Sequence, residues 1–154
     1  MMDYNNTAKL LTVLIAINTV IFLILSSLHF YWAFGGTLWY EDVLPTNSTG
    51  SKRMNPSVMA TLIVAFGILL LVFVTLGNQG IWDGHIKGKY FRYGALLISI
   101  TFFIRALGDF KFIGFFKTVK GTKFAINDIR FFSPLCVFIA VISLLIFMFN
   151  KSEP

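Results

Sequence analysis

Charged residues and cysteine are scarce in this sequence. Charged residues make up 13% of its 154 residues, whereas hydrophobic residues make up 56% and the mean hydropathy is +0.77. Because soluble domains contain about 45 to 50% apolar residues, a soluble globular domain is excluded. The single cysteine, Cys136, can form neither an internal disulfide nor a CxxC redox pair, which excludes a quinone-linked thiol oxidoreductase of the four-helix kind. The composition therefore predicts an integral membrane protein.

Apolar segments separate the clusters of charged residues. A bilayer-spanning helix needs about 20 predominantly apolar residues, and four segments approach or exceed that length, at residues 10–34, 56–76, 91–109 and 129–150. We therefore predict an all-α fold, a four-helix transmembrane bundle that forms one membrane domain over residues 1–154. The first apolar run is too long for a signal peptide and no A-x-A-like site follows it, so we expect it to stay uncleaved.

The third span carries charged residues into the membrane. Only 12 residues, Tyr93–Ile104, separate Arg92 from Arg105. Twelve helical residues cover about 18 Å, whereas the hydrocarbon core is about 30 Å thick. We therefore expect the helix to include Arg105 and Asp109, which at a spacing of four residues share one helix face. We predict an ion pair between these two side chains, or between one of them and Asp128, inside the bundle.

Aromatic residues alternate with lysines after the third span, at residues 110–117. RNA-binding surfaces use the same mixture, but next to a bilayer it is typical of an interfacial or re-entrant segment whose lysines extend to the headgroups. The net charge of +6 also arises largely from cations that flank apolar spans. We therefore predict membrane lipids as partners and no interaction with nucleic acid.

The topology gathers polar residues at one end of the bundle. Four spans place both termini on one side and the loops after the first and third spans on the other. The candidate ligand-binding residues at that second end are His29, Tyr31, Trp32, Arg105, Asp109 and Asp128. We expect His29 and Tyr31 to line a polar cavity together with Arg105 and Asp109. In the alternative, His29 faces the headgroups and the charged pair is purely structural.

The two histidines, His29 and His85, lie on opposite sides of the membrane in this topology. A metal or a bis-histidine haem needs ligands that converge. We therefore predict no metal site and no cofactor.

Four sequence motifs resemble those of a known protein family. They are HFYWAFGG at residues 29–36, RALGDFKFIGFFK at 105–117, FAIND at 124–128 and SPLC at 133–136. Together they resemble a family of small bacterial four-span membrane proteins that is catalogued as a domain of unknown function. The resemblance covers essentially the whole chain. It implies a four-helix membrane fold in the bacterial cytoplasmic membrane, and no reaction, ligand or partner.

The sequence favours a non-catalytic function. We predict a membrane protein that binds a lipid headgroup, a small amphiphile or a partner protein at its polar end. The alternative is an intramembrane isomerase or hydrolase acting on a lipid-like substrate, with His29 and Asp109 as acid and base. A third class, a small proton-coupled transporter, needs a carboxylate inside the first span, and the sequence has none between Asp3 and Glu41.

Lysine and arginine do not decide the orientation of the bundle. Five lie on the side of the termini and eight on the other, but five remain on each side when the embedded or interfacial Arg105, Lys111 and Lys117 are left out. We expect the termini in the cytoplasm, because a short, unprocessed N-terminal tail needs no export.

Overall fold

Four long helices make up most of this computed structural model, which describes residues 4–46 and 55–150. The elements are α1 (Tyr4–Ala33), η1 (Tyr40–Asp42), α2 (Val58–Gly77), α3 (Gly88–Leu107), α4 (Lys123–Asn127), η2 (Asp128–Phe132) and α5 (Ser133–Phe149). Within these residues, four helical segments are long and apolar enough to cross a membrane, namely Asn5–Ala33, Val58–Gly77, Gly88–Leu107 and Lys123–Phe149. The prediction of an all-α, four-helix transmembrane bundle is confirmed.

Capping residues account for two of the helix ends that differ from the predicted ones. Ser57 caps α2, and its hydroxyl accepts a hydrogen bond from the N–H of Ala60 at 3.2 Å, so α2 begins at Val58 and not at Pro56. At the end of α3, Gly108 has φ +90° and stops the helix at Leu107. The expectation that α3 reaches Asp109 was wrong.

The fourth span contains a wide turn. The segments α4, η2 and α5 follow one another without a break, and η2 is a π-helical turn in which the N–H of Ser133 donates to the carbonyl of Asp128. Pro134, at the start of α5, has no N–H to continue a regular helical ladder. The π turn accommodates the missing N–H of Pro134 within the span. The Asp128 side chain, at the start of this turn, points into the protein and is fully buried.

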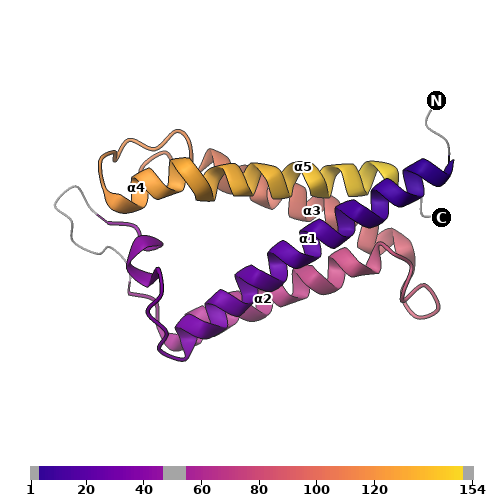
Figure 1. Cartoon of the computed structure of the whole chain (residues 1–154), viewed down its shortest axis with the longest axis horizontal. Coiled ribbons are helices and arrows are strands. Elements are labelled where there is room, and N and C mark those ends of the chain that lie inside the picture. Colours follow the sequence, from indigo (N-terminus) through magenta and orange to yellow (C-terminus); the bar gives the residue numbers. More distant parts are fainter. Residues whose placement is uncertain (1–3, 47–54, 151–154) are drawn as a thin grey trace.

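The four long helices form two antiparallel pairs, α1 with α2 and α3 with α5 (Figure 1). The pairs meet at the end that holds the start of α1 and the end of α5, and they diverge toward the other end. Where they meet, the Asn150 amide donates to Asn78 Oδ1 at 2.8 Å, and Asn78 Nδ2 donates to the carbonyl of Phe91 at 3.1 Å. These amide contacts join the two pairs at the terminal end of the bundle.

Two apolar clusters and several buried hydrogen bonds between helices hold the interior together. One cluster, nearer the terminal end, is built on Leu14, Ile15, Ala95, Ile142 and Ile146, and the other is built on Phe22, Val72, Ile98 and Ile139. Between them, the buried Asn18 amide donates to the Ser143 hydroxyl at 2.8 Å and links α1 to α5. Interhelical hydrogen bonds of this kind contribute about 0.6 kcal/mol on average in a membrane protein, so packing supplies most of the cohesion.

Candidate functional site

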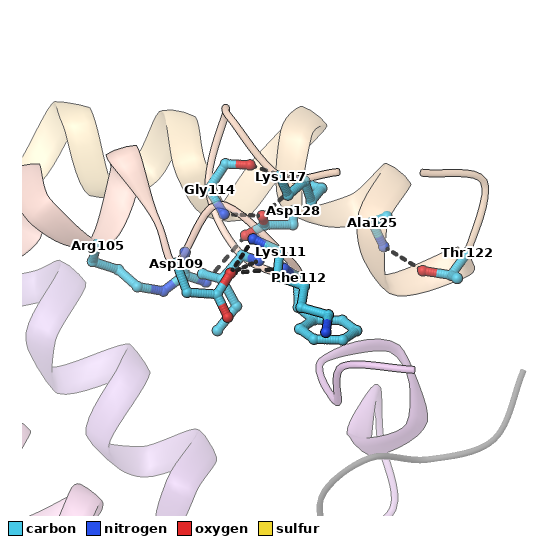
Figure 2. A network of polar contacts seen from close by, with 10 residues as sticks. Arg105, Asp109, Lys111, Phe112, Gly114, Lys117, Thr122, Ala125 and Asp128 are labelled. Atoms are coloured by element: carbon cyan, nitrogen blue, oxygen red, sulfur yellow. Dashed lines mark hydrogen bonds and ion pairs between the residues drawn. The ribbon is translucent and has the colours of Figure 1, made fainter. Parts of the chain in front are cut away.

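A buried carboxylate organises the loop end of the α3–α5 pair. Asp128 is fully buried, and its two oxygens have three hydrogen-bond donors (Figure 2). Oδ1 accepts from Arg105 Nη2 at 3.0 Å, and Oδ2 accepts from Lys117 Nζ and from the N–H of Gly114, both at 2.7 Å. Lys117 Nζ also donates to the carbonyl of Gly114 at 3.0 Å. We refer to Arg105, Lys117, Asp128 and the Gly114 backbone as the Asp128 cluster.

Two cations and one anion give the Asp128 cluster a formal charge of +1. The Lys117 side chain is fully buried beside Asp128, whereas the Arg105 side chain is 33% exposed. The expectation that the lysines of residues 110–117 extend to the headgroups was wrong for Lys117, because Asp128 gives it a buried partner. Lys111 in the same segment is exposed. Of the two pairings expected for Arg105, with Asp109 or with Asp128, the structure has the one with Asp128.

Two glycines allow the loop after α3 to fold back on itself. Gly108 and Gly114 have φ values of +90° and +88°, and their backbones lie against each other. A Cβ atom at Gly108 would overlap the carbonyl of Ile113, and one at Gly114 would overlap the carbonyl of Leu107. The N–H of Phe115 closes the loop by donating to the carbonyl of Ala106 at 2.9 Å. This close approach brings the Gly114 N–H to Asp128.

Asp109 caps this loop and does not pair with Arg105. Its Oδ1 accepts hydrogen bonds from the backbone N–H groups of Lys111, Phe112 and Ile113 at 3.0, 2.7 and 2.9 Å. Because Gly108 ends the helix, Asp109 lies outside α3, and the shared helix face on which the Arg105–Asp109 pairing depended does not exist. Burial raises the pKa of the Asp109 carboxyl, but the N–H groups of Phe112, Ile113 and Lys111 outweigh burial and hold that pKa below its ordinary value of 3.8.

The lowered pKa of Asp109 predicts how the loop responds to acid. A depressed carboxyl pKa stabilises the folded loop above the ordinary value, and this stabilisation is lost as the pH falls through the lower, folded value. We therefore expect the amides of residues 111–113 to stay protected from hydrogen exchange down to pH values below 3.8. The Asp109→Asn variant, whose side chain does not ionise, should show less protection of these amides at neutral pH. Equal protection in both proteins would contradict a role for the charge.

The aromatic residues predicted for the site lie at the end of α1 and have partners of their own. His29 Nδ1 is 2.8 Å from the carbonyl of Leu25, and the His29 ring packs edge-on against Trp32 at 5.0 Å between centroids. The Trp32 indole donates to the carbonyl of Leu38 at 2.8 Å. Tyr31 is half-exposed, and its ring lies against Gly36. A cavity shared by His29 and Tyr31 with Arg105 and Asp109 stays a prediction.

We did not predict two features of the site, and the sequence contained a signal for only one of them. Gly108 followed by Asp109 is a typical helix end, because glycine readily adopts the positive φ values at which helices often end. Lys117 occupies the last position of the RALGDFKFIGFFK motif, but the sequence does not show that it folds back onto Asp128. The burial of Lys117 depends on the path of the whole loop, so no local pattern could reveal it.

Some polar atoms next to the Asp128 cluster are buried without a hydrogen-bond partner in the described part of the chain. They are Arg105 Nη1 and the hydroxyl oxygen of Ser133, the residue whose N–H donates to the Asp128 carbonyl. Both groups can donate a hydrogen bond, and a guanidinium has five N–H donors in a planar fork. The site therefore has unused hydrogen-bonding capacity as well as excess positive charge.

One family matches most of the chain. Residues 22–143, which run from α1 into α5, match the family described as Protein of unknown function (DUF3995). The chain belongs to this family. The matched region of this DUF3995 protein contains every residue of the Asp128 cluster, and the predicted resemblance to a four-span family of unknown function is confirmed. No curated protein and no solved structure matches the chain.

Proposed function

We propose that this DUF3995 protein is a non-catalytic, multi-pass membrane protein that binds the anionic group of a membrane lipid or small amphiphile at Arg105. The observation that carries the proposal is the incomplete hydrogen bonding of the Arg105 guanidinium. Arg105 donates through Nη2 to Asp128, while Nη1 is buried without a hydrogen-bond partner among the described residues. One third of the Arg105 side chain is exposed, but Nη1 is not, so a ligand would contact the exposed part of the side chain and reach Nη1 only by displacing the atoms that cover it.

The rest of the Asp128 cluster supports an anionic ligand. Lys117 and the Gly114 N–H hold Asp128 from its buried side, so Asp128 has a cationic partner besides Arg105. Arg105 therefore supplies the net positive charge of the cluster. An ionisable residue within a membrane span is in general associated with function. A planar guanidinium can donate two parallel hydrogen bonds to a carboxylate or a phosphate.

The enzyme alternative has less support. It requires Asp109 to exchange a proton near neutral pH, whereas three backbone N–H groups hold its carboxylate and keep its pKa below the ordinary value. His29 Nδ1 is engaged with the carbonyl of Leu25 in its own helix. Both environments fit structural roles for these side chains.

We also propose a bacterial cytoplasmic membrane as the location, with both termini in the cytoplasm. The motif resemblance supports this membrane as the location. In this arrangement Arg105 and the Asp128 cluster lie near the outer leaflet, where the polar headgroup of a lipid is within reach.

Lipid binding by variants of two arginines in α3 tests the proposed function. Arg92 lies near the start of α3, where it donates to the Phe147 carbonyl at 3.1 Å and stacks on the Phe147 ring, so Arg92→Gln is the matched control. We expect Arg105→Gln to weaken binding of phosphatidylglycerol by about tenfold or more, the equivalent of one charge-assisted hydrogen bond. Arg92→Gln should bind like the wild type. The measurement is native mass spectrometry of the detergent-purified protein with titrated lipid.

Thermal unfolding of the same samples separates a loss of binding from a loss of fold. Arg105→Lys keeps the charge at this position but lacks the planar fork, so we expect it to bind with intermediate affinity. If folded Arg105→Gln bound phosphatidylglycerol as tightly as Arg92→Gln does, the proposed function would be wrong.

A further inference from the structure

Some apolar side chains at the loop-end margin of the Phe22–Ile139 cluster are only partly buried. Leu25 of α1, Phe102 of α3 and Leu135 of α5 pack against this cluster, and each lies three or four residues nearer the loop end than Phe22, Ile98 and Ile139, respectively. Other residues at this level stay buried, among them Cys136 and Ser26, whose hydroxyl donates to the Ala65 carbonyl of α2. The two helix pairs diverge at this level in Figure 1. The apolar interior is therefore least covered between the pairs, toward the loop end, and we refer to this place as the opening.

Arg105 lies where this opening begins to widen. Phe102 of α3 contacts Phe22 of α1 across the two helix pairs, with ring centroids 5.6 Å apart. Arg105 follows Phe102 by three residues, so it lies on the same side of α3, about one helical turn nearer the loop end. The guanidinium and the apolar opening are thus adjacent.

An ion pair joins the two helix pairs again beyond the opening. Lys123 of α4 contacts Asp42 of η1 at 2.6 Å, and η1 lies between the end of α1 and α4 (Figure 1). The segment that follows α1 therefore crosses back to the α3–α5 pair at the loop end. Because the opening is bounded at both ends, a ligand that reaches it from the membrane would enter sideways, between the helices.

We propose that one acyl chain of an anionic lipid lies between α1 and the α3–α5 pair, alongside Leu25, Phe102 and Leu135, with its phosphate at Arg105. This inference rests on the proposed function of Arg105 and adds where the rest of the ligand lies. The charge of the headgroup complements the net charge of the Asp128 cluster. The chain complements the partly exposed apolar side chains, which pack on the Phe22–Ile139 cluster but do not close over the opening.

A lipid fits this place better than a free anion does. The opening lies within the membrane-spanning part of the helices, where water cannot satisfy polar groups. A free phosphate would have to lose its hydration shell to reach Arg105, and it would leave the apolar side chains uncovered. A lipid brings a headgroup that is already at the interface and a chain that is already in hydrocarbon.

Photocrosslinking tests this arrangement. The probe is phosphatidylglycerol with a diazirine in its acyl chain, and the control probe is phosphatidylcholine with the same chain. Mass spectrometry of the crosslinked peptides should show Leu25, Phe102 and Leu135 labelled about tenfold more by the anionic probe, a ratio that reflects one charge-assisted contact. In Arg105→Gln this preference should vanish. Leu97 and Ile100, which are exposed on α3, should be labelled equally by both probes in both proteins.

Different outcomes would overturn different parts of the argument. If phosphatidylglycerol binding required Arg105 but labelling occurred only at exposed positions such as Leu97, the chain would not lie between the helices and the proposed function would stand. If glycerol phosphate displaced the probe as effectively as unlabelled phosphatidylglycerol does, the headgroup alone would explain binding and the chain site would again be wrong. If binding did not require Arg105, both the chain site and the proposed function would fail.

Discussion

Replacing Asp128 by alanine should destabilise the protein by about 3 to 5 kcal/mol, the cost expected when a buried ion pair loses one partner. Lys117 would keep its charge in a fully buried position beside a small cavity, and the Gly114 N–H would lose its acceptor. Thermal unfolding or unfolding by denaturing detergent, with helix content followed by circular dichroism, measures the effect. Asp83→Ala, which removes an exposed carboxylate, should change stability by less than about 0.5 kcal/mol.

A double variant tests whether charge pairing is the cause. Asp128→Leu combined with Lys117→Met replaces the buried pair by apolar side chains of similar volume, and such replacements are often neutral or stabilising. We therefore expect the double variant to be more stable than Asp128→Ala. If the double variant were less stable than the single one, the hydrogen bonds to the loop, and not the compensation of charge, would be the main contribution of Asp128.

The second large effect should come from Gly108→Ala. Alanine would have to adopt φ +90°, and its Cβ atom would overlap the Ile113 carbonyl and the Gly114 backbone. Backbone strain alone costs about 1 to 3 kcal/mol, so the total loss of stability should exceed about 3 kcal/mol. Because the loop could then no longer close, we also expect protease cleavage between residues 108 and 117.

Gly121→Ala is the matched control for this variant. Gly121 has a similar φ of +86°, but a Cβ atom there would meet nothing within 4 Å. Gly121→Ala should therefore show the backbone strain alone, and the difference between the two variants measures the close approach of Gly108 to Gly114. Equal losses of stability would mean that the loop can move apart at little cost.

The four spans could be predicted because their uncharged lengths match the thickness of a bilayer. The same argument misplaced the third helix. The expected length of about 20 residues was reached by extending the helix to Asp109, whereas the structure reaches 20 residues by starting at Gly88. Arg92 is accommodated within the helix because its side chain lies over the Phe147 ring, at 4.7 Å from the centroid. No pattern in the sequence indicates this contact between two distant segments.

The candidate site was predictable in its location but not in its pairing. Topology alone brings Arg105 and Asp128 to the same end of the bundle. Whether Arg105 pairs with Asp109 or with Asp128 depends on one residue, Gly108, which removes Asp109 from the helix. The second partner of Asp128, Lys117, depends on a loop held by backbone contacts, and such contacts leave little trace in the pattern of side chains.

The π turn has a consequence for changes in chain length. A π turn holds one residue more than an α-helical turn, so deleting one residue between Asp128 and Phe132 would restore a regular helix. Because the wide turn holds its extra residue within a single turn, α4 and α5 would keep nearly the same angular phase, and Asp128 would stay on the side of Arg105 and Lys117. A one-residue deletion farther along α5 would instead rotate everything before it by about 100° relative to the rest of that helix. The wide turn is therefore the place in the fourth span where the loss of one residue should be tolerated best.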